Sequence, residues 1–512
     1  MSKATLIKST GVIGIATALS RGLGFVRDIV IANYFGTSLG AQAFVVAFRI
    51  PNSLRDLVGE GATNSAIVPV LTEYRSLNDE KEFLRVSKIL FNISFVVLSV
   101  LTILGILFSP VIVRLIAPGF TAEPDKFNLT VTLNRVIFPY LILIGLTAYS
   151  MGVLNAMKHF AGPAFGPALL NIALIGSAVW FCPRIGVMGL VIGVLIGGVF
   201  QLGLNIPFLY RNGIKIDFKE GFRHAAVSRI GRLLVPRTIG TAVYQINIFV
   251  DTILASLAWI VGSGGVAALY YANRLIQFPL GIFGIALAQA ALPKMSEEFA
   301  KNDIERFKDT LCFSLRMVFL IMVPSGIGLA VLGEPIIRIL FERGEFTSYS
   351  TAITQSALFY YSFGLLAYGG VKLLVTSFYS MHDTMTPVKT AFAAVIINII
   401  LSLALMRHLK LGGLALATSI SATFNFVALF ILLRKKLGDF GTRSIVDSFL
   451  RVLYASVAMG VAVKIFVVRT ADFGIFSLIV SLLIGGMVFF AACFLFNVKE
   501  ARDFIAWTSK RR

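Results

Sequence analysis

Two neighbouring apolar segments, residues 11–36 and 41–74, contain charged residues that an ordinary membrane helix excludes. Their charged residues include Arg21, Arg27, Asp28, Arg49, Arg55, Asp56 and Glu60. An Arg at the centre of a spanning helix costs about 2.5–3.5 kcal/mol on insertion scales. Because such residues usually face a water-filled cavity or a partner, they indicate a transport pathway.

Polar residues in the second segment recur at three- and four-residue spacing: Asn52, Asp56, Glu60 and Thr63. This spacing places them along one helix face, which predicts a polar interior for that face. A second interpretation stays open, in which Arg27–Asp28 and Arg55–Asp56 are ion pairs whose arginine stems reach the membrane interface.

The composition supports a membrane protein. Of 512 residues, 57% are hydrophobic and 14% are charged, against roughly 25% charged in soluble proteins, and the mean hydropathy is +0.85. The apolar runs are long and do not alternate, which favours helices over a barrel. We expect fourteen spans: residues 8–34, 42–72, 87–117, 129–157, 163–182, 186–210, 230–260, 265–295, 311–340, 352–380, 386–407, 412–434, 446–468 and 474–497.

Loop charge predicts the orientation. With the N-terminus inside, most Lys and Arg of the loops fall on the cytoplasmic side, so both termini are expected there. The basic loop Lys215–Arg232 is expected to lie on the inner leaflet. Much of the net charge of +20 lies in such loops, so it orients the chain and does not indicate a nucleic-acid partner. Lys3 and Lys8 precede an apolar run without a cleavage site, which predicts a retained first helix.

Cysteine and histidine give no sign of a metal centre. The three cysteines, Cys182, Cys312 and Cys493, lie in or beside apolar segments without motif spacing, and the four histidines are scattered. We therefore expect buried free thiols, with no disulfide and no cysteine or histidine metal site.

The chain contains an internal repeat. The segment that begins at Gly40 resembles the one that begins at Gly265, and this match aligns Arg49 with Arg274. Further pairs follow in chain order at the same offset, to within one position: Pro110 with Pro335, Pro163 with Pro387, and Gly189-Leu190 with Gly413-Leu414. A six-helix unit has an even number of spans, so both copies share one orientation.

This repeat predicts the domain organisation. We expect an all-α polytopic protein with two six-helix lobes related by a parallel repeat, plus two extra C-terminal helices. The predicted parts are an N-terminal lobe, a basic cytoplasmic linker, a C-terminal lobe, two added helices and a basic tail: residues 1–213, 214–229, 230–437, 446–497 and 498–512.

Transporters built on such repeats bind substrate between the halves and expose it alternately. Arg49 and Arg274 occupy equivalent positions facing that cleft, and the other arginines make it cationic, so an anionic ligand is expected. Arginine forks suit phosphate oxygens. Because the sequence has no Walker A, kinase or hydrolase motif, the energy must come from an ion gradient, the membrane potential or downhill coupling.

Five stretches carry a resemblance to a known family. They are SRGLGFVRD at 20–28, AFRIPNSLRDLVGEGATNSAIVPV at 47–70, APGF at 117–120, YYANRLIQFPLGIFGIAL at 270–287 and TPVKTA at 386–391. Over essentially its whole length the sequence resembles the MurJ (MviN) family of lipid II flippases, in the multidrug/oligosaccharidyl-lipid/polysaccharide (MOP) exporter superfamily. The stretch containing GEGA is the most distinctive.

The resemblance implies a function in cell wall biogenesis. The expected partner is lipid II, an undecaprenyl-pyrophosphate disaccharide-pentapeptide, moved from the inner to the outer leaflet of the bacterial cytoplasmic membrane for peptidoglycan synthesis. The family's essential cavity arginines match Arg21, Arg27, Arg55 and Arg274, which are implied to hold the pyrophosphate. The two added helices are implied to accommodate the polyprenyl tail, and the expected state is a monomer.

Some family members also bind sodium in the C-terminal lobe. The matching positions are Asp251, Asn398, Ser402, Leu414 through its carbonyl, and Thr418. Oxygen ligands suit a hard cation. The sequence departs from the family at Ser402, where a carboxylate is expected, so a weaker site or none is implied. The alternative is a buried polar network around Asp251. Beyond this sodium ion no cofactor is expected.

Two other functional classes share some of these features. A cation-coupled polysaccharide-lipid or drug exporter of the same superfamily is the main alternative, but drug exporters typically have twelve helices and lack these arginines. A membrane-embedded enzyme would need a carboxylate or histidine constellation and loops large enough to build a site, and the sequence shows neither. We therefore expect a transporter without catalytic activity.

Overall fold

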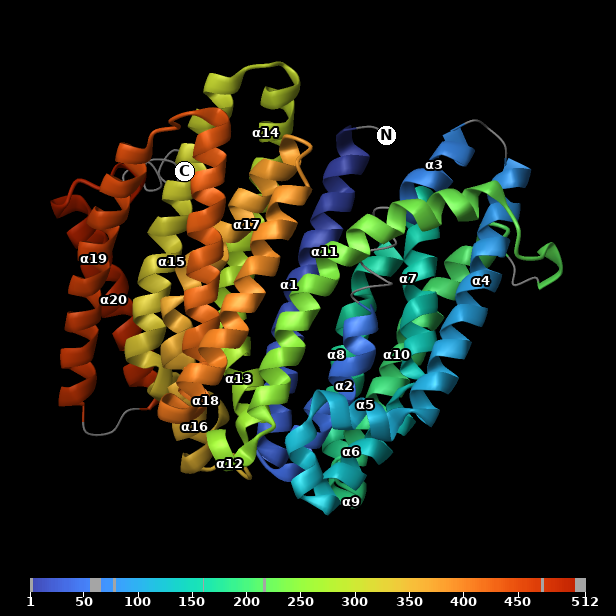
Figure 1. The fold of residues 1–512 in the computed structure, drawn as a ribbon, viewed down its shortest axis with the longest axis horizontal. Helices are drawn as coiled ribbons and strands as arrows, with labels where there is room; N and C mark the ends of the chain where they lie inside the picture. Colours follow the sequence, from blue (N-terminus) through green and yellow to red (C-terminus); the bar gives the residue numbers. More distant parts are fainter. Residues whose placement is uncertain are drawn as a thin grey trace. The chain divides into compact units, whose positions relative to one another are not determined.

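The computed structural model describes residues 3–55, 66–76, 80–159, 161–214, 218–470 and 474–501. All regular structure in these residues is helical (Figure 1). The chain divides into two compact units, Met1–Leu257 with Arg343–Phe346, and Ala258–Glu342 with Thr347–Arg512. The predicted lobes, linker and tail remain predictions.

The first unit is built from helices of very different lengths. Its helices are α1 (Lys3–Phe35), α2 (Leu39–Arg55), α3 (Val68–Ser76), α4 (Glu80–Leu107), α5 (Ser109–Ile116), η3 (Pro118–Ala122), α6 (Pro124–Ile137), α7 (Tyr140–Ala156), α8 (Ala161–Trp180), α9 (Cys182–Ile185), α10 (Met188–Arg211), η4 (Phe218–Glu220) and α11 (Ala225–Ala255). A core of buried apolar residues holds α1, α2, α6, α7, α8 and α10 together, with Tyr140 and Leu190 fully buried in it.

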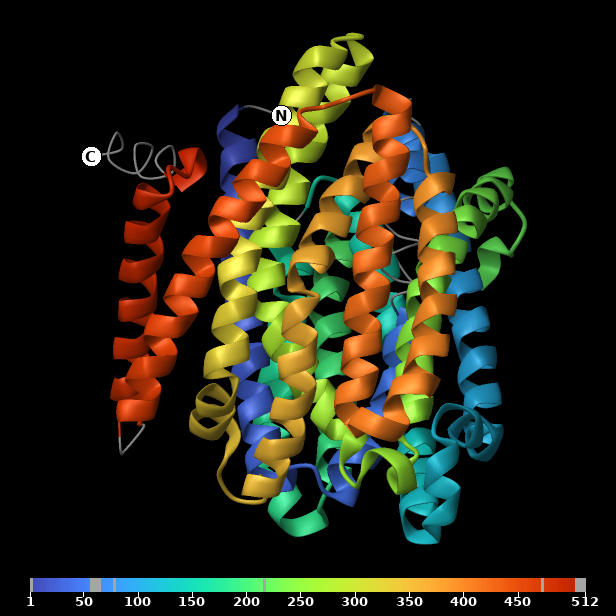
Figure 2. The same cartoon turned by 60° about the vertical axis from the view of Figure 1, so that its left-hand side comes forward.

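The second unit contains the remaining helices. They are α12 (Ala258–Val261), α13 (Gly265–Pro279), the π-helix η5 (Leu280–Gly284), α14 (Ile285–Ala300), α15 (Ile304–Phe341), α16 (Ser348–Phe363), α17 (Leu365–Ser380), α18 (Met385–Leu437), α19 (Thr442–Arg469) and α20 (Ile475–Leu495). Figure 2 shows α18 as two helical stretches. The break is at Lys410, whose φ of 51° lies outside the helical region.

The structure confirms an all-helical polytopic membrane protein. Within its described part, eight helices are long and apolar enough to cross a membrane, or nine if the pair α16 and α17, bent by 48°, forms one span. The count of fourteen remains a prediction. Several predicted spans are divided into shorter helices: 87–117 is α4 and α5, and 129–157 is α6 and α7.

Corresponding helices of the two repeat copies pack alike within each unit. Helix α2 packs on α6 and α4 on α7, while α13 packs on α16 and α15 on α17. The sequence match also extends further than the four pairs above, because Pro69, Glu73 and Phe83 recur as Pro293, Glu297 and Phe307 at the offset that relates Pro163 to Pro387. The ends of α3 and α14, and the starts of α4 and α15, fall at the same places in this match.

Candidate functional site

Arg27 lies on α1, where that helix packs against α8. Its Nη2 donates to Asp28 Oδ1 over 2.6 Å, and its Nη1 donates to Asn171 Oδ1 of α8 over 3.0 Å. Asn171 Nδ2 in turn donates to the carbonyl oxygen of Ser20 over 3.0 Å. Arg27 is 9% exposed and Asp28 is 0% exposed, so a buried ion pair is fixed in place by an amide from a second helix.

This geometry bears on both interpretations of Arg27. The guanidinium is paired with Asp28, as the ion-pair interpretation predicts, but it is buried between helices and does not reach an interface. Asn171 was missed in the sequence. The signal for it was present, since Asn171 is a lone amide within the apolar stretch of α8, and polar groups at such depth usually have a specific partner.

The other arginines of the first unit have different surroundings. Arg21 is exposed and lies about 120° around α1 from Arg27, because six residues separate them. Arg49 is half-buried on α2, and its Nη1 donates to Thr252 Oγ1 of α11. The backbone beside Arg49 is anchored by Asn134 of α6, which donates to the carbonyl of Ala47 over 3.4 Å.

Several predicted residues fall beyond these contacts. Asp56 and Glu60, with the stretch containing GEGA, lie outside the described residues, as does the side chain of Arg55. Residues 215–217 of the basic loop and the C-terminal tail from 502 lie outside them too. Arg274 belongs to the second unit, where it is half-buried on α13.

Four of the five predicted sodium ligands come together on α18. Asn398 Nδ2 donates to Thr418 Oγ1 over 3.1 Å, which joins the two helical stretches, and Thr418 Oγ1 donates to the carbonyl of Leu414 over 3.0 Å. Ser402 lies one turn after Asn398, and both are 0% exposed. Asn398 Oδ1 and Ser402 Oγ make no hydrogen bond within the described part of the chain. Asp251 lies on α11, in the first unit.

Oxygens of this kind fit a hard cation. The set has a buried amide oxygen and a buried hydroxyl available, as a cation site needs, but no carboxylate on α18 itself. Among the described residues, no group of three or more His, Cys, Asp or Glu side chains could hold a metal ion. A transition-metal site is therefore not indicated there.

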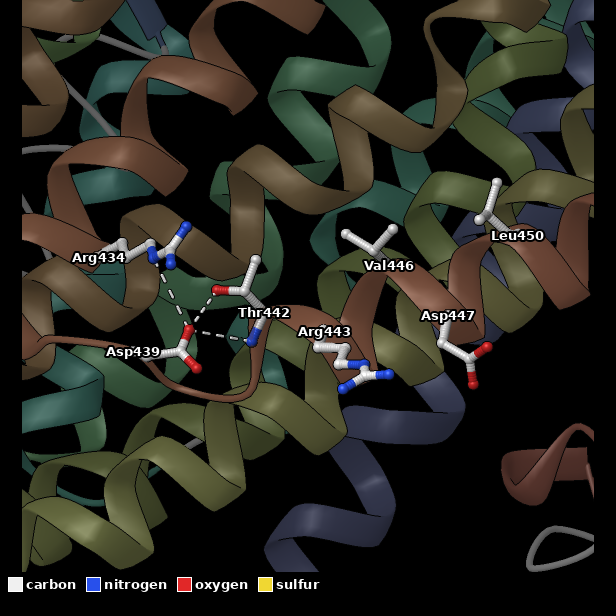
Figure 3. A pocket seen from close by; sticks show the side chains of 7 residues that line it. All are labelled: Arg434, Asp439, Thr442, Arg443, Val446, Asp447 and Leu450. Carbon is white, nitrogen blue, oxygen red and sulfur yellow. Dashed lines mark hydrogen bonds and ion pairs between the residues drawn. The ribbon is translucent and has the colours of Figure 1, made fainter.

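An open pocket of about 470 Å³ lies at the corner between α18 and α19 (Figure 3). It is lined by Arg434, Asp439, Thr442, Arg443, Val446, Asp447 and Leu450. Asp439 Oδ1 accepts from the backbone nitrogen of Thr442 over 3.2 Å and lies 3.7 Å from Arg434 Nε. The Thr442 hydroxyl holds the pKa of Asp439 below its usual value. These groups cap the turn, and none of the predicted site residues lines the pocket.

Comparison with known proteins identifies the family. A family model described as "Lipid II flippase MurJ" matches residues 31–489. The chain belongs to the MurJ family. Curated MurJ relatives match along most of their length. The "Probable lipid II flippase MurJ" of Haemophilus influenzae is 37% identical over 88% of this chain and 91% of its own length. The "Lipid II flippase MurJ" of Burkholderia cenocepacia is 34% identical over 82% of each.

Solved structures agree with MurJ membership. A "Lipid II flippase MurJ, inward closed conformation" has a TM-score of 0.82 and 29% identity, covering 96% of this chain and 99% of its own. An inward-facing MATE family transporter of the MOP superfamily has a TM-score of 0.70 at 15% identity, with 84% and 99% covered. The second likeness, at 15% identity, shows the fold alone.

Proposed function

We propose that this chain is a lipid II flippase. It moves the undecaprenyl-pyrophosphate disaccharide-pentapeptide from the inner to the outer leaflet for peptidoglycan synthesis. The observation that carries the proposal is the MurJ family match across residues 31–489, with relatives up to 37% identical over 471 residues. Flipping breaks no covalent bond, which agrees with a transporter without catalytic residues.

The arginines supply the chemistry for an anionic headgroup. Pyrophosphate carries several oxygens, and a guanidinium fork can bridge two of them where Lys offers a point charge. Arg21 is exposed, Arg274 is half-buried, and Arg27 is already paired with Asp28 and Asn171. We therefore assign Arg21 and Arg274 to direct contact with phosphate, and we add Arg55 on the family match alone, because its side chain lies outside the described residues. Arg27 has both a structural and a binding role, because Asn171 and Asp28 orient it toward the same ligand. Arg49 supports the cavity through its hydrogen bond to Thr252.

The chain acts as a monomer in the bacterial cytoplasmic membrane, with both termini in the cytoplasm. The basic segments Arg434–Lys436 and Lys215–Arg232 support this orientation, because loops rich in Lys and Arg stay on the cytoplasmic side. The exposed apolar residues of α20, among them Phe476, Leu482 and Leu495, provide a lipid-facing surface for a polyprenyl tail.

Sodium is proposed as a bound ion of the second unit. Asn398, Ser402, Leu414 and Thr418 would hold it, and the family match adds Asp251 as the one carboxylate of the set. A sodium ion there would couple the ion gradient to the conformation of α18. This part of the proposal is supported by the two buried oxygens of Asn398 and Ser402 that make no hydrogen bond in the described part of the chain.

Complementation tests the function. A bacterium depleted of its own lipid II flippase should regain growth when it expresses this chain, and lipid II should reach the outer leaflet. Arg274→Ala, expressed at the same level, should fail. If the unmutated chain is present in the membrane and neither growth nor lipid II export returns, the proposal is wrong.

A further inference from the structure

Gly119, in η3, packs directly on the end of α11. Its backbone nitrogen donates to Ser256 Oγ over 3.0 Å. A Cβ atom added to Gly119 would overlap the carbonyl group of Ser256, so only glycine permits this approach. Gly119 and Ser256 are both buried, and both belong to the first unit. The backbone of Gly119 therefore lies against that of Ser256 with no Cβ between them, close enough to bond the Ser256 hydroxyl.

A second contact of the same kind involves Gly344. This residue lies in the segment Arg343–Phe346, which connects α15 to α16 but belongs to the first unit. The backbone nitrogen of Glu345 donates to the carbonyl of Asn33 over 2.9 Å. A Cβ on Gly344, whose φ is +56°, would overlap the carbonyl of Asn33, and a Cβ on Gly36 would overlap that of Glu345.

The two contacts are equivalent in the internal repeat. Gly119 and Gly344 are related by the same offset in residue number as Arg49 and Arg274. Each glycine follows a helix that contains the matched prolines Pro110 and Pro335. Each contacts the C-terminal end of the first helix of the other copy: Gly119 meets α11, and Gly344 meets α1. The contacts are thus reciprocal between the two copies of the repeat.

All four segments lie on one side of the membrane. In the predicted topology they are the connections that follow the first, third, seventh and ninth spans, all of which face away from the cytoplasm. Alternating access through a cleft between repeat copies requires the copies to separate on this side when the cleft opens outward. Contacts that join one copy to the other must then break.

We propose that these contacts form two glycine latches, Gly119–Ser256 and Gly344–Asn33, which hold the extracytoplasmic side closed and release together when it opens. The inference rests on the proposed flippase function for its meaning. Glycine suits such a device because bare backbones approach closely when the latches are closed, while little side-chain surface must be repacked when they open.

Coupling between the latches is the first test. In a chain whose three native cysteines are replaced, Ser256→Cys should react slowly with a membrane-impermeant maleimide, because Ser256 is 1% exposed. Adding Gly344→Ala breaks the other latch and should raise the labelling rate at Ser256→Cys severalfold. Gly186→Ala is the matched control: its φ of +59° gives the same backbone strain, but nothing lies within 4 Å of its added Cβ.

Cross-linking is the second test. The backbone hydrogen bond between Asn33 and Glu345 brings these two segments of the chain into the range that a disulfide spans. Asn33→Cys with Glu345→Cys should form a disulfide under oxidation and stop lipid II export, and reduction should restore export. Each single cysteine variant should export lipid II under both conditions.

The outcomes separate the latches from the flippase function. Equal labelling for Gly344→Ala and Gly186→Ala, or full export by the cross-linked protein, would overturn the latch proposal. If the unmutated chain exports no lipid II, the proposed flippase function is wrong. The labelling comparison still tests the latch proposal, because labelling needs no substrate.

Discussion

Arg27 Nη1 and Asn171 Oδ1 lie 3.0 Å apart, and this hydrogen bond joins α1 to α8. The same amide uses its nitrogen to hold the carbonyl of Ser20, so Asn171 bridges two turns of α1. A guanidinium that is oriented from two sides loses little further freedom when it binds an anion. Asn171 is therefore a positioning residue for Arg27 in the proposed site.

Replacing Asn171 tests this relationship. Asn171→Ala removes two hydrogen bonds, each worth about 0.5–1.5 kcal/mol net, but leaves the Arg27–Asp28 pair intact. We expect lipid II export to fall roughly tenfold, with a small loss of thermal stability. Ile172→Ala, at the next position and 50% exposed, should leave export unchanged. Equal export by the two variants would show that Asn171 does not position Arg27.

The buried pair of Arg27 and Asp28 predicts a different result for Arg27 than for Arg21. Arg27→Ala removes the guanidinium that pairs with the fully buried Asp28 over 2.6 Å, and breaking a buried pair costs about 3–5 kcal/mol. We expect poor folding of Arg27→Ala and normal folding of Arg21→Ala, whose side chain is exposed. The double variant Arg27→Met with Asp28→Asn should recover expression without recovering export. Recovery of both would return Arg27 to a purely structural role.

The arginines, the repeat and the family stretches were available in the sequence, because charge in apolar helices and a constant offset between matched positions need no coordinates to be recognised. The partners of those arginines could not be predicted from the sequence. Asn171 is 144 residues from Arg27, and Thr252 is 203 residues from Arg49. Helix periodicity places a residue on a face but does not say which helix covers that face. The burial of Arg27 against Asp28 and Asn171, and with it the expected cost of removing this arginine, therefore emerges only from the structure.

The sequence predicts a boundary between two spans near Lys410, where α18 breaks. The two helical stretches form a hairpin, and a side-chain contact joins its two open ends. Asp383 precedes α18 and accepts from the backbone nitrogen of Thr386 over 3.1 Å and from Lys436 Nζ over 2.9 Å. Lys436 lies in the last turn of the same helix. One carboxylate thus ties the start of α18 to its end.

Acid should weaken the interactions of Asp383 with Thr386 and Lys436. Burial raises the pKa of Asp383, but hydrogen bonds from Lys436 and Thr386 outweigh it and hold that pKa below its usual value. The stabilisation is therefore full above the unfolded pKa of about 4 and is lost as pH falls through the lower folded pKa. Asp383→Asn keeps an oxygen that can accept from Thr386 but loses the partly exposed ion pair with Lys436, so it should cost about 0.2–1 kcal/mol at neutral pH and nothing at low pH. Lys436→Ala should lower the unfolding temperature, while Lys435→Ala, its exposed neighbour, should not.

Orientation can be tested with single cysteines. Arg223→Cys lies in the basic loop that we place in the cytoplasm, and Gly474→Cys lies at the N-terminal end of α20, on the opposite side in the predicted topology. An impermeant maleimide added to intact cells should label Gly474→Cys and not Arg223→Cys, and permeabilised cells should label both. The reverse pattern in intact cells would invert the topology.

The sodium proposal makes the last prediction. An ion that binds only the folded state stabilises it by RT ln(1 + [ion]/Kd), and so raises the unfolding temperature. The unmutated protein should therefore unfold at a higher temperature in sodium than in potassium. Asp251→Ala should remove the difference, because it deletes the one carboxylate of the five positions. Thr418→Val should also reduce it, because it removes an oxygen that contacts Asn398. Ser402→Asp should enlarge it, because a carboxylate one turn from Asn398 adds charge to a cation site. If the protein shows no sodium dependence and Ser402→Asp creates none, the four residues of α18 form a helix–helix polar network without an ion.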